Sequence, residues 1–215
     1  MKAFNIFISI LIFFISSLAN ANEKIKFSLD WKFEGPSAIF LTSKERGYYK
    51  SSGLDVTIDS GKGSRDAIPK VASGTYPLGF ADINSVIKFL DQNPKAKVKA
   101  IMMVYDRPPF AIIGRKSLGV VKPKDLEGKI LGAPAPDGAY AQWKSFVKAN
   151  NINASKVKIE NVGFPVREPM LASGKVQAIT GFSFSSYINL ASKGVSEDDI
   201  SCLLYTSDAA DDWSG

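Results

Sequence analysis

Histidine is absent from the 215 residues, and the single cysteine, Cys202, lies close to the carboxyl end. A histidine general base is therefore excluded, and a cysteine nucleophile would have to come from the end of the chain. One cysteine cannot form an internal disulfide. The sequence contains neither the spacing of a zinc site nor the G-x-S-x-G turn of serine hydrolases. We expect no metal and no cofactor, and these absences favour binding over catalysis, although a loop carboxylate could still serve as a general base.

Long apolar runs are lacking after the first 21 residues. Those residues combine Lys2, an apolar stretch over 3–15 and Ala19-Asn20-Ala21, which is the pattern of a secretory signal peptide cleaved after Ala21. As a membrane anchor the stretch would be too short, because about 30 Å of hydrocarbon at about 1.5 Å per residue requires about 20 apolar residues. No cysteine follows the cleavage site to carry a lipid. We therefore predict export from the cytoplasm.

Concentrated positive charge is also lacking. The formal net charge is +6, with 45% hydrophobic and 22% charged residues, as in ordinary folded proteins. The basic excess is mostly lysine spread along the chain, and no basic run is interleaved with aromatic residues. We therefore expect a lysine-rich surface and no binding of nucleic acid.

The last residues do not look like a natural protein end. Residues 202–212 read CLLYTSDAADD, which resembles the translation of a sequencing-library adaptor joined to a broken reading frame. We therefore predict that the native sequence stops near Ser201, that residues 202–215 are a non-native tail, and that the chain is truncated at its carboxyl end.

Short apolar stretches with the period of strands alternate with stretches that have the period of helices. The predicted strands cover residues 25–29, 54–58, 78–81, 98–104, 110–113, 129–133, 157–162 and 178–181, and the predicted helices cover residues 36–46, 67–73, 84–91, 138–149 and 169–173. This alternation is typical of α/β proteins, in which mainly parallel sheets are flanked by helices.

Two stretches of the chain share one order of elements. They are VASGTYPLGFADINS at residues 71–85 and LASGKVQAITGFSFSS at residues 171–186. Coincidence would also account for the common Ala-Ser-Gly, but the shared order favours two similar α/β lobes. Pro108 and Pro109 interrupt an apolar stretch between them. We therefore assign residues 22–107 to lobe 1 and residues 108–201 to lobe 2, which would be incomplete.

The candidate site lies where predicted strands end. In open α/β sheets, ligands bind outside the carboxyl ends of the strands, and the helices that follow offer free backbone N–H groups. Loops from two facing lobes would converge on one cleft. On this basis we predict the following ligand-binding residues: Trp31, Phe33, Glu34, Ser37, Gly61, Gly63, Ser64, Asp82, Asp137, Gly138, Phe182 and Phe184.

Several of these residue types suit a flat, amino-bearing ring. Trp31 and Phe33 could stack on such a ring, and Glu34 and Asp82 could accept hydrogen bonds from its amino groups. Each residue also has a simpler interpretation, because aromatic side chains often fill a core and Asp82 could merely cap the next helix. Asp137, which precedes the predicted helix at residues 138–149, could likewise merely cap that helix.

The stretch SGKGS at residues 60–64 lacks the G-x-x-x-x-G-K-[ST] spacing of a phosphate-binding P-loop. Gly61 and Gly63 could still let the backbone approach a ligand. An ordinary glycine-rich turn explains the stretch equally well.

Two longer stretches identify a family. Residues 27–87, which begin FSLDWKFEGPSAIF and end GFADINSVI, together with DLEGKILGAPAPDGAY at residues 125–140, resemble the periplasmic substrate-binding proteins of ABC importers. The branch is the one that includes binders of the thiamine pyrimidine, nitrate, sulfonates and taurine. The resemblance covers residues 23–190. It implies a type 2 periplasmic binding fold, in which two α/β lobes joined by crossover segments close on a ligand and the chain returns to lobe 1 after lobe 2.

The resemblance also implies a function. It implies a monomeric solute-binding component in the periplasm that closes about the crossover at Tyr105–Pro109 and delivers its ligand to a permease in the inner membrane. Relatives that synthesise the thiamine pyrimidine need histidine and a cysteine-rich motif, which this sequence lacks.

The loop residues favour a pyrimidine or a related heterocycle as the ligand. A sulfonate, taurine or nitrate would require donors such as helix N-termini and Ser64, and loop carboxylates disfavour anions. Two further alternatives are an enzyme of the same architecture that uses a loop carboxylate, and a ligand-sensing module of a membrane receptor.

Overall fold

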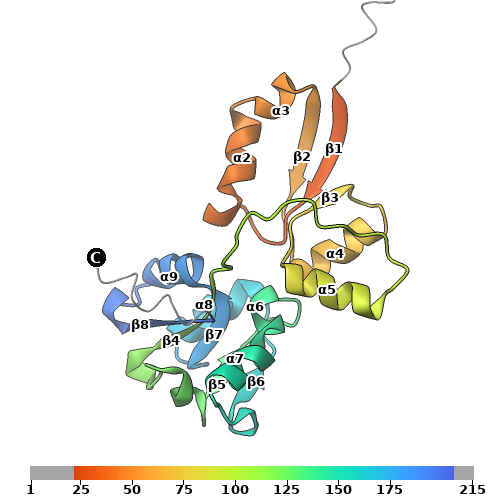
Figure 1. Ribbon diagram of the computed structural model, residues 1–215. Helices are drawn as coiled ribbons and strands as arrows, with labels where there is room; N and C mark the ends of the chain where they lie inside the picture. The colour runs from red at the N-terminus through yellow and green to blue at the C-terminus, as the bar shows by residue number, and fades with distance from the viewer. Residues whose placement is uncertain (1–21, 206–215) are drawn as a thin grey trace, which may run out of the picture.

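Two separate sheets divide the protein into two α/β lobes (Figure 1). The computed structural model describes residues 22–205. The predicted signal peptide at residues 1–21 and most of the predicted tail, residues 206–215, lie outside the described residues. The predicted α/β class, with parallel strands flanked by helices in each lobe, is confirmed.

Lobe 1 contains a parallel sheet with the strand order β2-β1-β3. The central strand pairs with both neighbours, so that Phe27 lies opposite Ile58 on one side and Leu78 on the other. Because both pairings are parallel, all three strands end at one edge of the sheet. The elements of lobe 1 are β1 (Glu23–Ser28), η1 (Gly35–Ser37), α2 (Ala38–Glu45), α3 (Tyr48–Ser51), β2 (Leu54–Asp59), α4 (Ser64–Ala72), β3 (Leu78–Gly79) and α5 (Ile83–Gln92).

Lobe 2 contains a mixed sheet with the order β6-β5-β7-β4-β8. Strands β6, β5 and β7 are parallel, and β4 runs antiparallel to both β7 and β8. The elements are β4 (Phe110–Arg115), η2 (Lys116–Leu118), η3 (Pro123–Leu126), β5 (Ile130–Gly132), α6 (Gly138–Ala141), α7 (Trp143–Ala149), η4 (Ala154–Lys156), β6 (Lys158–Glu160), η5 (Phe164–Val166), α8 (Arg167–Ala172), β7 (Ala178–Phe182), α9 (Ser183–Ala191), η6 (Glu197–Asp199) and β8 (Ile200–Leu204).

The sheet of lobe 2 is buried on both faces. Successive residues of a strand point to opposite faces, and Ile112 packs with Phe146 of α7 while Ile113 packs with Leu190 of α9. Burial on both sides explains why the sequence of β4 is apolar without alternation. The core of lobe 1 is smaller, with Leu29 among its few buried side chains.

The predicted strand at residues 98–104 is wrong. Residues 93–109 contain neither helix nor strand, and the side chains of Ile101, Met102 and Met103 are 78%, 72% and 60% exposed. An apolar run forms a strand only where a neighbour offers backbone partners. Within the described residues β3 pairs with β1 alone, and residues 98–104 form no backbone pairing with its other edge.

Two smaller differences concern element boundaries. The helix predicted over residues 138–149 divides at Gln142 into α6 and α7. Residues 202–204 belong to β8 and pair with β4, so the expected junction after Ser201 falls inside a strand, and the non-native origin of the tail stays a prediction.

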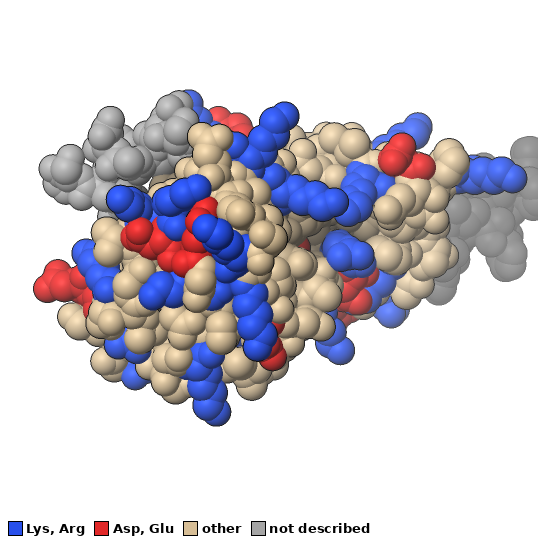
Figure 2. Space-filling model, turned by 90° about the horizontal axis from the view of Figure 1, so that it is seen from below, with Lys and Arg blue, Asp and Glu red and all other residues tan. Residues whose placement is uncertain are grey.

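Two further features of the described residues are the lengths of the helices and the distribution of charge on the surface. Within residues 22–205, no helix has the length and apolar character that crossing a membrane would require. Figure 2 shows Lys and Arg side chains spread over one face of the molecule and interspersed with Asp and Glu, in keeping with a lysine-rich surface.

The two-sided core of lobe 2 gives a stability prediction. Ile179 is 0% exposed, whereas Ile188 on α9 is 63% exposed. We expect Ile179→Ala to lower the free energy of unfolding by about 2–5 kcal/mol, because it leaves a cavity in a close-packed core. Ile188→Ala should change it by about 0.5 kcal/mol or less. Urea denaturation of both variants measures the difference, and similar costs would contradict this description of the core.

Candidate functional site

Loops from both lobes meet where the parallel strands end (Figure 1). Lobe 1 contributes the segments after β1, β2 and β3, and lobe 2 contributes the segments after β5, β6 and β7. The convergence follows from the parallel pairing within each sheet, since parallel strands direct their following loops to one edge. Direct contacts between loops of different lobes define the junction, among them the hydrogen bond from Arg65 to Ala135 and the ring contact of Trp31 with Phe164.

Ser64 joins three of these loops. Its side chain is 2% exposed, and its hydroxyl donates to Asp30 Oδ2 at 3.2 Å and accepts from the backbone N–H of Asp82 at 3.0 Å. A Cβ on Gly138 of lobe 2 would lie 3.3 Å from Ser64 Oγ and 3.4 Å from Asp82 Cβ. Three predicted residues, Ser64, Asp82 and Gly138, are therefore brought together from two lobes.

Gly63 permits the close approach of the lobes. Its φ of +106° lies in a region that L side chains rarely adopt. A Cβ there would fall 2.4 Å from the carbonyl oxygen of Pro136, while its N–H donates to the carbonyl of Asp30 at 2.6 Å. Next to it, Arg65 Nη1 donates to the carbonyl of Ala135 at 2.9 Å. Gly61 acts within lobe 1, where its N–H donates to the carbonyl of Trp31 at 3.0 Å.

Trp31 lies between the lobes. Its indole N–H donates to Glu34 Oε2 at 3.0 Å. Its ring meets that of Phe164 edge-on, with centroids 4.3 Å apart, and the guanidinium carbon of Arg167 lies 5.2 Å from the ring centroid. Cation–π contact of this kind stabilises an arginine that has left water.

Arg167 holds a buried group of carboxylates in lobe 2. It is 3% exposed, and its Nε and Nη2 donate to Glu168 Oε1 at 3.0 and 2.6 Å. Its Nη1 lies 3.7 Å from Asp137 Oδ2, which also accepts from Thr180 Oγ1 at 2.6 Å. Burial raises the pKa of Asp137, against the opposing effects of Arg167 and the Thr180 hydroxyl.

Asp30 belongs to lobe 1 and accepts a hydrogen bond from Ser64. Burial raises the pKa of Asp30 to about 7. The hydrogen bond from Ser64 acts in the opposite direction, and the charges of Asp137 and Asp82 raise the pKa further. The carboxyl group therefore changes its charge near neutral pH.

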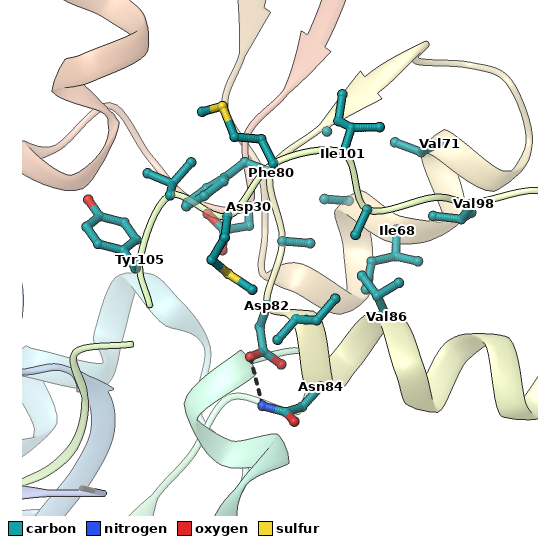
Figure 3. A pocket seen from close by; sticks show the side chains of 18 of the residues that line it. Asp30, Ile68, Val71, Phe80, Asp82, Asn84, Val86, Val98, Ile101 and Tyr105 are labelled. Carbon is teal, nitrogen blue, oxygen red and sulfur yellow. Dashed lines mark hydrogen bonds between the residues drawn. The ribbon is translucent and has the colours of Figure 1, made fainter. Parts of the chain in front are cut away.

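A cavity of about 720 Å³ opens beside the junction. Figure 3 shows Asp30 and Tyr105 toward one end of it and Val71 and Val98 toward the other. Most of its wall is apolar, from α4, β3, α5 and residues 97–106. Its size is that of a small-molecule pocket, about 300–1,000 Å³. Of the predicted residues, Asp82 and Phe182 line it.

The remaining predicted residues have other surroundings. Phe33 is 55% exposed. The hydroxyl of Ser37 donates to the carbonyl of Glu34 at 2.8 Å and so stabilises its own turn. Phe182 and Phe184 contact each other edge-on, with centroids 6.0 Å apart. Direct ligand contact by these residues stays a prediction.

Three residues of the junction were missed from the sequence. Asp30 directly follows the predicted strand at residues 25–29 and meets the same criterion as Trp31. Phe164 and Arg167 follow β6, but the predicted helix starts at Pro169, two residues after the observed start of α8. Arg167 was therefore not recognised as a residue between the end of a strand and the start of a helix.

Metal ligation has no support among the described residues. Across residues 22–205, no group of three or more His, Cys, Asp or Glu side chains is arranged to hold a metal ion. The carboxylates at the junction are engaged instead with Ser64, with Thr180 and with Arg167.

Two α/β lobes, each with parallel strands flanked by helices, define a type 2 periplasmic binding fold. The chain belongs to the NMT1/THI5 like family, whose sequence model matches residues 36–207.

Known relatives are longer than this chain. The riboflavin-binding protein RibY of Chloroflexus aurantiacus is 22% identical over 160 residues, which cover 74% of this chain and 45% of that protein. The formylaminopyrimidine-binding protein of Halalkalibacterium halodurans is 27% identical over 169 residues, which cover 79% and 49%. The chain thus spans about half the length of these relatives.

A solved structure supports the fold. The alkanesulfonate-binding protein SsuA from Xanthomonas axonopodis pv. citri, bound to MOPS, aligns with a TM-score of 0.62 at 13% identity. The alignment covers 84% of this chain and 60% of that one. At this identity the likeness concerns the fold.

The close approach at Gly63 is testable against a matched glycine. Gly74 also has a positive φ, +77°, but a Cβ there would meet no atom within 4 Å. We expect Gly74→Ala to cost about 1–2 kcal/mol of unfolding free energy, from backbone strain alone. Gly63→Ala should cost more and should increase the radius of gyration in small-angle X-ray scattering, because the added methyl group pushes the lobes apart at Pro136. Equal costs with unchanged scattering would show that the lobes do not touch there.

Proposed function

We propose that this protein is the solute-binding component of an ABC importer and that it binds a small, flat, amino-bearing heterocycle between its lobes. The observation that carries this proposal is the excess of carboxyl groups at the junction, where Asp137 and Glu168 pair with the buried cation Arg167, while Asp30 and Asp82 interact with Ser64 and Ser85.

Arg167 already has two carboxylate neighbours. Its guanidinium already donates to Glu168 and lies 3.7 Å from Asp137. A sulfonate or nitrate would have to displace one of these carboxylates or approach them, and like charges in a poorly solvated site repel strongly. Groups that donate hydrogen bonds, such as ring amino groups, instead complement the acceptors.

Aromatic side chains make the site complementary in shape to a flat ligand. Trp31 and Phe164 meet on one side of the junction, and Phe110 and Phe182 lie 5.4 Å apart on another. Such rings provide faces for a flat ligand, each contact adding about 0.5–1.5 kcal/mol beyond the area that it buries. The names of the two relatives, which refer to riboflavin and to formylaminopyrimidine, support a flat nitrogen heterocycle.

Capture would proceed by closure of the lobes about the connection at residues 93–109. A ligand that touches both lobes stabilises the closed form in proportion to its preference for that form. Micromolar affinity requires about −8 kcal/mol in total, which a few stacking contacts and hydrogen bonds can provide. The exported protein would act in the periplasm as a monomer and would deliver its unaltered ligand to an inner-membrane permease.

Thermal-shift screening tests the ligand class. We expect 4-aminopyrimidine to raise the melting temperature, because a ligand at one hundred times its Kd stabilises the folded state by about 2.7 kcal/mol. Taurine and nitrate should leave the melting temperature unchanged. A shift with taurine or nitrate alone would refute the proposed ligand class, and conversion of the bound heterocycle into another compound would indicate an enzyme.

Trp31 should contribute to affinity through both the ligand and the lobe contact. We expect Trp31→Ala to weaken binding of 4-aminopyrimidine by at least about tenfold, about 1.4 kcal/mol, with the fold retained. Tyr48 on α3, which is 55% exposed, provides the control, and Tyr48→Ala should bind normally. Isothermal titration calorimetry measures both, and normal affinity of the Trp31 variant would remove Trp31 from the site.

A further inference from the structure

Asp30 differs from the other carboxyl groups at the junction in its partners. Asp137 and Glu168 interact with Arg167, and Asp82 caps α5 by accepting from the backbone N–H of Ser85. Asp30 Oδ2 accepts one hydrogen bond, from Ser64 Oγ at 3.2 Å. Its side chain borders the cavity (Figure 3).

The groups that face Asp30 are acidic or neutral. They are Ser64 at the start of α4, Asp82 before α5, Asp137 before α6 and Tyr105 of the connection between the lobes. Burial and the two neighbouring acids favour the protonated form, which makes Asp30 a neutral acid below about pH 7. A protonated carboxyl group both donates and accepts a hydrogen bond.

We propose that Asp30 is the specificity-determining residue of the site, and that its carboxyl group binds the edge of a heterocycle where an amino group stands beside a ring nitrogen. This inference rests on the proposed function. The carboxyl O–H donates to the ring nitrogen, and the carbonyl oxygen accepts from the amino group. One proton is shared within the pair, and no covalent bond changes.

The proposal narrows the ligand class. An asparagine side chain offers the same donor and acceptor in the same geometry, as it does when it binds adenine through N6 and N7. A sulfonate or nitrate presents acceptors only, so it could not satisfy the carbonyl oxygen of Asp30. Heterocycles that lack the amino group lose one of the two hydrogen bonds and leave a buried acceptor unpaired.

The affinity for the ligand should fall as the pH rises. The complex holds a proton that the free protein loses as the pH rises through about 7. Binding above that pH must take the proton up again, so affinity should fall by up to about tenfold per pH unit. Below about pH 7 the Asp30 contribution should become constant.

The test compares three variants by isothermal titration calorimetry with 4-aminopyrimidine at about pH 6.5 and about pH 8.5. We expect wild-type affinity to fall by about 20-fold between these pH values. Asp30→Asn should bind within about threefold of wild type at the lower pH and show no Asp30-linked loss at the higher pH. Asp30→Leu should bind at least about tenfold more weakly than wild type at the lower pH. Asp55→Asn on β2, an exposed site in the same lobe, should behave as wild type.

Distinct outcomes separate this inference from the proposed function. Titration of the probe itself is common to all variants and cancels in the comparison. If wild type binds but Asp30→Asn shows the same pH dependence, or if Asp30→Leu binds as tightly as wild type, Asp30 is not the specificity-determining residue although the proposed function stands. If wild type binds no aminopyrimidine at either pH, the proposed function fails and this inference fails with it.

Discussion

The junction between the lobes depends on one buried guanidinium group. Arg167 comes from lobe 2, lies against the ring of Trp31 from lobe 1 and pairs with Glu168 and Asp137. Burying these charges is costly unless each keeps a partner. Removal of any member would leave the others uncompensated, so the geometry of the whole group is fixed together, and the position of Trp31 is fixed with it.

The same group underlies the ligand class that we propose. Arg167 donates to Glu168 and lies 3.7 Å from Asp137, whereas Asp30 Oδ2 accepts a hydrogen bond, among the described residues, only from Ser64. A site that contains both a guanidinium and carboxyl groups discriminates between ligands by their hydrogen-bond pattern more than by their net charge. These contacts are the basis for the proposal that the ligand is a neutral heterocycle and not a small anion.

The two lobes contribute differently to this site. Lobe 2 has a sheet covered on both faces and carries the buried ion pairs, whereas lobe 1 has a small core around Leu29, Val56 and Ile58. In lobe 1 the loops are instead held together by hydrogen bonds, because Ser64 donates to the carboxyl group of Asp30 and the N–H of Gly63 donates to its backbone carbonyl. In the closure that we propose, this hydrogen-bonded set of loops would meet the buried ion pairs of lobe 2.

The sequence by itself determined the α/β class, most strands and helices, and the placement of Trp31, Asp82 and Gly138 at strand ends, because periodicity and turn chemistry act over a few neighbouring residues. Only the tertiary structure decided that Arg167 lies against Trp31, that burial holds Asp30 near its titration point, and that the apolar run at residues 98–104 forms no strand. Each of these depends on what residues distant in the chain place alongside, and neither burial nor a pairing partner is encoded in any local stretch.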